Sequence, residues 1–313
     1  ANSNDSHAFI GKAVSSQKMS LVNSWREINL HRFSFKVGQK MEDVLGQLSK
    51  DPNVEFAEPN WILNKMEMVE ENSVQTMGTR TTYDIGTIEA RRKFAGYAQT
   101  GAPVQVNEAW AELAAGGIAE ASEANGLTAL GASVPVVAVI DTGVDIEHFV
   151  FVQSEAIWTN TKEIPRNGID DDNNGFVDDV NGWNFVEDGA HIYDDDGHGT
   201  HVAGIVLGAS QDILVRSPAL ARIKIMPLKF MSGDGSGTTS DAIQAIYYAV
   251  NNGANILNNS WGGEEYGRSL HEALTYAYSK KVLIVTASGN FGTDNDVRPI
   301  YPANLDVPGL VSV

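Results

Sequence analysis

The sequence predicts an α/β protein built on a doubly wound parallel sheet and preceded by a small α+β module. The first observation is a set of short apolar runs, of the kind that a sheet buries on both faces, at residues 135–140, 223–230, 254–257 and 282–286. The second is that segments with helical periodicity lie among these runs, at residues 201–207, 241–252 and 270–280. Alternating strands and helices are typical of a parallel sheet with helices on both faces.

The third observation is a different pattern near the N-terminus. Residues 31–63 contain an apolar strand, an amphipathic helix starting near Met41, and the segment DPNVEFAEPNWIL, which together predict a strand–helix–strand module. Residues 64–101 are polar and weakly periodic, which indicates a linker or an exposed crossover. Farther along the chain, Ser240 is the expected N-cap of the helix at 241–252, and Gly253 its expected stop.

Composition narrows the functional classes. The 313 residues carry a formal net charge of -18, which argues against a nucleic-acid surface because phosphates require a clustered positive field. There are no cysteines, so any stabilising metal ion would need oxygen or imidazole ligands. No apolar run approaches the roughly 20 residues of a membrane span.

Three polar residues follow predicted strands or begin a predicted helix, where α/β sheets place their ligands. These residues are Asp141 in DTGVD, His198 in DGHGTHVAGI and Asn290 in SGN. An acid that orients a histidine, a histidine that accepts a proton and an amide that stabilises an oxyanion are the parts of serine-type acyl transfer. Each signal alone is weak, because an Asp after a strand is commonly a turn residue and an Asn after Gly commonly a cap.

The motifs VVAVIDTGVD, HGTHVAGI, NNSWGG and VTASGN, in this order, resemble those of the subtilisin-like (S8) serine proteases. The resemblance extends from about residue 107 to residue 313. It implies a secreted serine endopeptidase zymogen in which Asp141 is the orienting acid, His198 the general base and Asn290 the oxyanion donor. It also implies an enzyme of the cell exterior or envelope that cleaves polypeptides. The absence of cysteines and the acidic composition favour a bacterial source.

The same resemblance implies two strands that clamp an extended substrate through main-chain hydrogen bonds. Gly235, Ser236 and Gly237 would form one side, and Ser260, Trp261 and Gly262 the other. Without the resemblance, the segment GDGSG would be interpreted as a flexible loop. The family commonly has a glycine where this chain has Ile300, so we expect a smaller or reshaped primary specificity pocket.

The acidic run NGIDDDNNGFVDDVNGW predicts a calcium site, because it repeats the first nine positions of an EF-hand-type loop. The expected ligands are Asp170, Asp172, Asn174, the carbonyl of Phe176, and Asp178. Asp179 is an alternative to Asp178, and position twelve is Asn181 instead of a glutamate. A solvated acidic loop without a metal is the competing interpretation. Residues 194–196, a second acidic run just before His198, are interpreted as an exposed run.

The N-terminal module resembles the inhibitory propeptide of the same proteases, most specifically in DPNVEFAEPN. The resemblance implies a small α+β, ferredoxin-like fold that docks on the protease and sends its C-terminal tail through the active site. We therefore expect an inhibitory propeptide at residues 1–66, its tail and a linker at 67–104, and the N-terminal part of the catalytic domain at 105–313, with the tail itself within 65–78. A stabilising accessory domain is the alternative.

The family's nucleophile lies in a Gly-Thr-Ser-Met-Ala type segment, which this sequence does not contain. From the spacing of the family, we expect that segment about forty residues beyond Val313. The 313 residues alone are thus predicted to be inactive, and a segment carrying the serine is an expected partner. The favoured explanation is a longer chain. The alternative is a non-catalytic peptide-binding or inhibitor protein with a calcium-binding loop.

Overall fold

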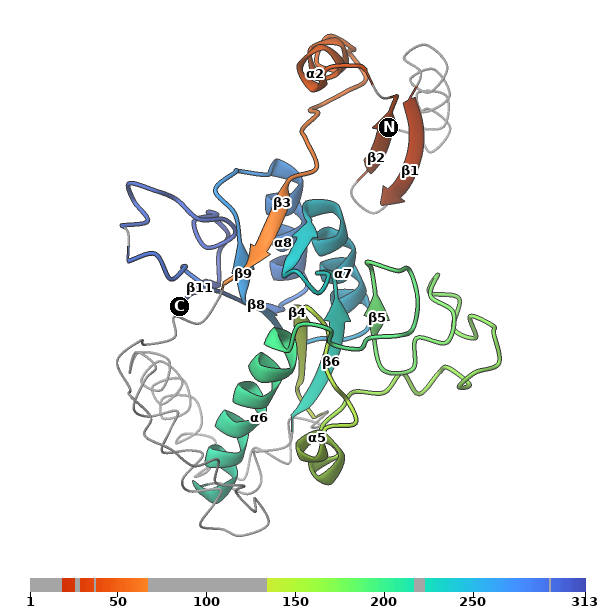
Figure 1. Ribbon diagram of the computed structural model, residues 1–313, viewed down its shortest axis with the longest axis vertical. Coiled ribbons are helices and arrows are strands. Elements are labelled where there is room, and N and C mark those ends of the chain that lie inside the picture. Colours follow the sequence, from red (N-terminus) through yellow and green to blue (C-terminus); the bar gives the residue numbers. More distant parts are fainter. Residues whose placement is uncertain (1–18, 26–28, 37, 67–133, 217–222, 293) are drawn as a thin grey trace.

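The computed structural model describes residues 19–25, 29–36, 38–66, 134–216, 223–292 and 294–313. In this part of the chain, the main sheet has six strands in the order β11-β10-β8-β4-β6-β5, all paired in parallel (Figure 1). The strands are β4 (Val136–Asp141), β5 (Trp183–Asn184), β6 (Lys224–Lys229), β8 (Ile256–Asn259), β10 (Leu283–Thr286) and β11 (Leu310–Ser312). Because β6 and β8 flank β4 on opposite sides, the sheet extends both ways from β4, which confirms the predicted doubly wound α/β fold.

The apolar run of β4 is continuous because each of its faces is covered. Val137 and Val139 pack in a core cluster with α5 (Phe149–Ser154) and α6 (His198–Arg216). Ala138 and Ile140 belong to the cluster that includes α7 (Thr239–Asn251) and α8 (Arg268–Ser279). Successive side chains of a strand point to opposite faces, so four consecutive apolar residues serve two cores.

The helices begin earlier than the sequence predicts. α6 starts at His198, three residues before the expected start, and α7 starts at Thr239. The prediction that Ser240 is the N-cap of α7 was wrong. The cap is Thr238, whose side chain accepts a hydrogen bond from the backbone N–H of Asp241. The backbone N–H of Ser240 instead donates to Asn60 Oδ1 at 2.8 Å, a partner that lies in the N-terminal module. No described helix is both long and apolar enough to span a membrane.

The N-terminal module contains an antiparallel pair, β1 (Met19–Trp25) and β2 (Leu30–Phe35), followed by α2 (Met41–Leu48). The sequence pattern predicts the second strand and the helix but not β1. Met19 and Val44 are buried together here, with Phe33, Phe35 and Leu48 packed against them. After α2 the chain runs without regular structure until β3 (Ile62–Lys65). The module's own sheet therefore has two strands among the described residues.

β3 leaves this module and joins a separate sheet (Figure 1). It is the central strand of an antiparallel sheet, between β7 (Ser236–Thr238) and β9 (Trp261–Gly262). The expected tail and linker at residues 67–104 lie outside the described residues, as do residues 105–133. The strand seen between β7 and β9 lies N-terminal to that segment.

Candidate active site

Asp141 and His198, which are 57 residues apart in sequence, meet at the carboxyl edge of the main sheet. Asp141 ends β4 with no exposed surface, and His198 is the first residue of α6. Their Nδ1 and Oδ1 atoms are 2.7 Å apart, and the side chain of His198 is 8% exposed. Gly199 permits this approach, because a Cβ there would lie 2.1 Å from the backbone oxygen of Gly143. The structure thus brings the predicted acid and base together.

The environment of His198 favours its protonated form. Burial by itself lowers the pKa of the imidazole, but the hydrogen bond and charge of Asp141 and the carbonyl of Met66 outweigh it, and the pKa is raised above its ordinary value. The oxygen of Met66 lies 3.2 Å from Nε2. Since both ring nitrogens face oxygen acceptors, the doubly protonated ring donates at both positions.

The run at residues 194–196 is only partly the exposed run that we expected: Asp195 is exposed, but Asp194 is partly buried and organises the start of α6. Its carboxylate accepts hydrogen bonds from the N–H and Oγ1 of Thr200, the N–H of Gly197 and Oγ1 of Thr142. Burial by itself raises the pKa of Asp194, but these donors together lower it below its usual value. An aspartate just before a predicted helix is a capping signal that the sequence analysis did not use.

A buried lysine also lies beneath the site and was not predicted. Lys229 is 1% exposed, and its Nζ donates to the carbonyls of Thr142 and Met231 at 2.5 and 2.9 Å. The same Nζ is 2.6 Å from Oδ1 of Asp195. A buried cation with three oxygen partners is fully hydrogen-bonded, so it holds the loop after β4 in place.

The two predicted substrate strands form a groove that the chain's own β3 occupies. The pairing places Leu63 opposite Gly237, Asn64 opposite Gly262 and Lys65 opposite Trp261. Beyond the ladder, Lys65 N–H donates to the carbonyl of Gly235 at 2.9 Å, and Met66 N–H donates to the carbonyl of Ser260 at 3.0 Å. The predicted residues of both segments therefore line one groove, which ends at His198.

The side chains of the groove strand enter spaces that glycines leave open. Leu63 is 2% exposed, and a Cβ at Gly263 would lie 3.3 Å from its Cδ2. A Cβ at Gly262 would lie 2.6 Å from Met66 Cε and 2.9 Å from Cγ2 of Ile300. The side chain of Met66 thus ends beside the residue that replaces the usual glycine of the family.

The loop that leads into β7 is held by its own hydrogen bonds. The carboxylate of Asp234 accepts from the hydroxyls of Ser232 and Ser236, both at 2.7 Å, and from the N–H of Ser236. These donors lower the pKa of Asp234 to about 2. Gly235 follows with a φ of 75°, a backbone conformation that glycine adopts readily. The GDGSG segment is therefore an ordered turn that presents β7 to the groove.

Residues 132–312, more than half of the chain, match the subtilase family. The chain belongs to the subtilase family. Residues 4–60 match the fervidolysin N-terminal prodomain. This subtilase is 28% identical to a thermophilic serine proteinase of Bacillus sp. (strain AK1) over 278 residues, which are 88% of this chain and 54% of the relative. It is 38% identical to the minor extracellular protease Epr of Bacillus subtilis (strain 168) over 110 residues, 35% of this chain and 17% of the relative.

The fold is also similar to a solved structure, that of fervidolysin from Fervidobacterium pennivorans, described as a keratinolytic enzyme related to subtilisin. The TM-score is 0.61 with 21% identity, over 98% of this chain and 41% of fervidolysin. This subtilase sequence thus spans about half or less of each relative named here.

Asn290 follows β10 and is exposed, at a turn where Gly289 has a φ of 96°. In a parallel sheet, the carboxyl ends of β10 and β4 lie at the same edge, so Asn290 and Asp141 are on one side of the subtilase domain. A Cβ at Gly289 would lie 3.7 Å from Cγ1 of Ile300, which places this turn beside the Met66 end of the groove.

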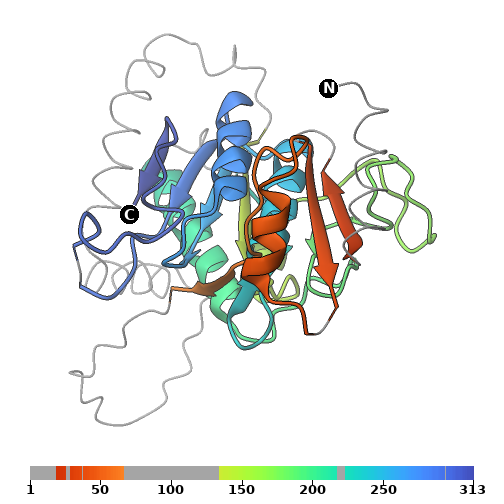
Figure 2. The same ribbon diagram turned by 90° about the horizontal axis from the view of Figure 1, so that it is seen from above.

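The N-terminal module of the subtilase packs against α7 and α8 (Figure 2). The carboxylate of Glu58 accepts hydrogen bonds from the first two N–H groups of α8, those of Arg268 and Ser269, at 2.8 and 3.0 Å. Arg32 forms an ion pair of 3.2 Å with Asp241 in the first turn of α7. A carboxylate at a helix N-terminus satisfies unpaired donors and complements the helix dipole, so Glu58 anchors the segment that leads into β3.

The predicted calcium loop gathers carboxylates, but in a set that differs from the expected one. Oxygens of Glu163, Asp170 and Asp172 lie within 4.8 Å of one another, and Glu163 is 6% exposed. Glu163 lies upstream of the EF-hand-like pattern, so that pattern gave no signal for it. Asp179 is fully buried and accepts a hydrogen bond from Tyr248 Oη at 2.5 Å. The burial of the Tyr248 hydroxyl is the main cause that raises its pKa, and the charge of Asp179 is the next largest.

The other expected calcium ligands also accept hydrogen bonds within the loop, as the three gathered carboxylates do. The oxygen of Asn174 accepts from the N–H of Phe176, and the oxygens of Asp178 accept from the N–H groups of Asn167 and Gly168. The ring of Phe176 packs edge-on against Trp183 and Tyr248, which fixes the loop on the domain. These residues shape the loop around the three gathered carboxylates.

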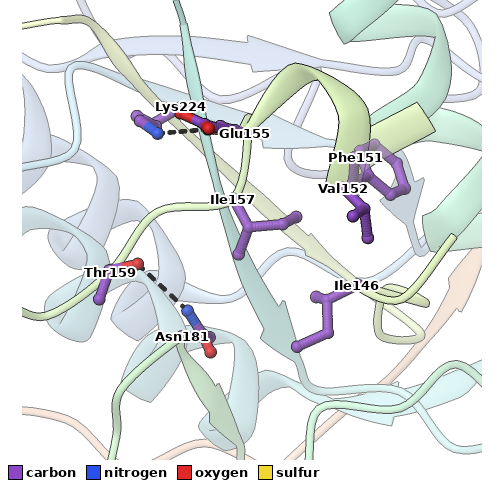
Figure 3. Close-up of a pocket in the computed structure, with 8 residues that line it drawn as sticks. All are labelled: Ile146, Phe151, Val152, Glu155, Ile157, Thr159, Asn181 and Lys224. Atoms are coloured by element: carbon purple, nitrogen blue, oxygen red, sulfur yellow. Dashed lines mark hydrogen bonds between the residues drawn. The ribbon is translucent and has the colours of Figure 1, made fainter. Parts of the chain in front are cut away.

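A hollow of about 340 Å³ lies elsewhere, beside α5 (Figure 3). Asn181 Nδ2 donates to Thr159 Oγ1 at 3.4 Å, and Lys224 Nζ donates to the backbone oxygen of Glu155. Lys224 begins β6, so the hollow is at the opposite end of that strand from the groove. We assign it no role in the chemistry because it lies at the end of β6 away from Asp141 and His198.

Proposed function

We propose that this subtilase is the precursor of a serine endopeptidase and that its N-terminal module is an intramolecular inhibitor. One observation carries the proposal: a peptide strand fills the groove between β7 and β9, and the carbonyl that ends it lies 3.2 Å from Nε2 of His198. Extended peptides bind to such strands through main-chain hydrogen bonds, which tolerate many side chains. The arrangement suits a polypeptide substrate.

In the proposed mechanism, Asp141 fixes the tautomer of His198 and stabilises its cation. His198 removes the proton of a serine hydroxyl as that oxygen attacks the peptide carbonyl, and then gives the proton to the leaving amine. Asn290 donates its side-chain amide to the oxyanion. The attacking hydroxyl in this mechanism is that of a serine, which completes the triad with Asp141 and His198.

The test is peptide hydrolysis by the protein expressed from its complete natural reading frame, so that any flanking residues are included. We expect cleavage of casein and of short quenched peptides, and complete loss of this activity after labelling with a fluorophosphonate, which reacts with activated serines. A protein that binds peptides without cleaving them, and that the fluorophosphonate does not label, would be a peptide-binding protein and would refute the proposal.

We also propose that the protein acts outside the cytoplasm of a bacterium, as a secreted or envelope-bound enzyme. The relative Epr is named as an extracellular protease, and the acidic, cysteine-free composition suits a secreted bacterial chain. Fractionation of the native cells with an antibody against the protein tests this, and a signal confined to the cytosol would contradict it.

We propose calcium as the structural cofactor, held by Glu163, Asp170 and Asp172. The donor set fits, because it consists of clustered carboxylate oxygens, which are the ligands that calcium prefers. Among the described residues, Lys162 is the cation paired with this set, and its side chain is 73% exposed and 3.7 Å from Asp172. Bound calcium would supply structural charge neutralisation and no chemical step.

Chelation is expected to lower the melting temperature of the protein by about 5 to 10 °C, which corresponds to losing a ligand present at about a hundred times its Kd. The measurement is a thermal melt with calcium or with a chelator. Asp170→Asn should abolish the difference, whereas Asp188→Asn, which changes an exposed aspartate outside the three gathered carboxylates, should retain it. Identical melting curves of the unmodified protein with and without chelator would remove the calcium proposal.

A further inference from the structure

The three aspartates before His198 each have a different kind of partner. Asp194 accepts hydrogen bonds from neutral donors near the start of α6. Asp195 pairs with Lys229, a buried residue of the main sheet. Asp196 pairs with Lys65, which belongs to the strand in the groove. The partners of Asp194 and Asp195 belong to the catalytic domain. Lys65, the partner of Asp196, belongs to the peptide strand that occupies the groove.

The contact between Lys65 and Asp196 is close and partly shielded from water. Lys65 Nζ lies 2.6 Å from Asp196 Oδ2, and the two side chains are 18% and 13% exposed. Asp196 is held in position because its Oδ1 accepts from the N–H of His198 at 3.1 Å. Ion pairs that are shielded to this extent are screened less by salt than surface pairs.

The aliphatic part of Lys65 also has a dedicated space. A Cβ at Gly235 would lie 2.6 Å from both Cδ and Cε of this lysine, so the side chain runs directly along the glycine backbone. Gly235 and Asp196 thus form a slot with an apolar wall and a negative end. A slot of this kind suits a long, unbranched cationic side chain.

The register of the strand fixes which peptide bond faces the chemistry. The carbonyl of Met66 is the one beside His198 Nε2, and the N–H of Met66 is bound to Ser260. The side chain of Met66 ends between Gly262 and Ile300. Lys65 is therefore the residue that directly precedes the one whose carbonyl would be attacked.

We propose that Asp196 is a specificity-determining residue that selects lysine at this preceding position, and that maturation cleaves the bond on the carboxyl side of Met66. This inference rests on the proposed function. The serine oxygen adds to the Met66 carbonyl carbon, the C–N bond to the next residue breaks, and His198 passes the serine's proton to the leaving amine. Water then hydrolyses the acyl-enzyme, which releases a fragment with a free carboxylate at Met66 and restores the serine hydroxyl.

The test compares quenched peptides on the mature enzyme from the complete reading frame. Each peptide carries the sequence of residues 60–70, which includes the bond on the carboxyl side of Met66, with lysine, norleucine or glutamate at the position of Lys65. Norleucine keeps the unbranched stem and removes the charge. We expect kcat/KM for the lysine peptide to exceed that for the norleucine peptide by about tenfold, with that for the glutamate peptide lower still.

Asp196→Asn provides the matching change in the enzyme, because asparagine keeps the oxygen that accepts from His198 N–H and loses the charge. This variant should lose about tenfold on the lysine peptide and little on the norleucine peptide, while Asp188→Asn should behave as the unmodified enzyme. Mass spectrometry of the released N-terminal fragment should show Met66 as its last residue.

Equal cleavage of the lysine and norleucine peptides by an active enzyme, or a fragment that ends elsewhere, would overturn this inference and leave the proposed function standing. An enzyme that cleaves none of the peptides, and no casein, would refute the proposed function itself. Because the peptide series needs no change to the protein, the result does not depend on whether Asp196→Asn folds.

Discussion

Replacing Asp141 with asparagine is expected to lower kcat of the mature enzyme by about 10⁴-fold. Asparagine has nearly the same shape as aspartate, but its neutral amide neither stabilises the His198 cation nor fixes the required tautomer. The KM for peptides should change little, since Asp141 is fully buried at the end of β4 and the substrate strands are elsewhere. Steady-state kinetics with a quenched peptide measures both constants.

The same substitution should change the titration of His198 in the full chain. In the unmodified chain, the raised pKa contributes stability that is fully present below the ordinary value of 6.5 and is lost as pH rises through the raised pKa. In Asp141→Asn the lowering effect of burial is expected to dominate, so the pKa falls below 6.5 and the sign of this contribution reverses. Ring resonances of His198 followed by NMR report the pKa directly. An unchanged pKa together with an unchanged kcat would contradict the assigned pairing.

Replacing Glu58 with alanine is expected to release the inhibitory strand. The change removes the acceptor of two N–H groups at the start of α8 and of the Ser269 hydroxyl, and charge-assisted hydrogen bonds of this kind each contribute about 1.5 to 3 kcal/mol. We therefore expect the backbone N–H groups of Met66 and Ser269 to exchange with solvent at least about 10 to 100 times faster, the factor that corresponds to the loss of one such bond. Hydrogen exchange of the full chain measures this without requiring activity.

Glu55→Ala is the matched control for this experiment. Glu55 pairs with the same Arg268, but its side chain is 77% exposed, and surface ion pairs contribute little. Exchange at Met66 should stay near that of the unmodified chain. If Glu58→Ala exchanged no faster than Glu55→Ala, the anchoring role of Glu58 would be wrong.

The main sheet and its catalytic pair were predictable because their signals are local. A run such as PVVAVI that is apolar at every position requires burial on both faces, and glycines around Asp141 and His198 mark where the backbone turns. In a parallel sheet, residues at strand ends gather at one edge whatever their separation in sequence. The confirmed fold and the Asp141–His198 contact both follow from these two rules.

Other features depended on partners that no local pattern encodes. The N-cap of α7 is Thr238 and not the expected Ser240. The backbone N–H of Ser240 instead donates to Asn60, which lies 180 residues earlier in the chain. The acidic cluster includes Glu163, which only the folded loop brings beside Asp170. Hydrogen-bond and ion-pair partners distant in sequence are set by the fold, and local propensity carries no information about them.

The sequence by itself determined the α/β sheet and placed Asp141 and His198 at the ends of its elements, because periodicity and glycine spacing are properties of the chain. The two segments that line the groove were expected from the resemblance to the subtilisin-like proteases. Only the tertiary structure decided that Ile62–Lys65 fills the groove and that the three adjacent aspartates have separate roles. In the sequence these aspartates are chemically identical. Their surroundings distinguish them, since Asp194 meets neutral donors, Asp195 a buried lysine and Asp196 the lysine of the occupying strand.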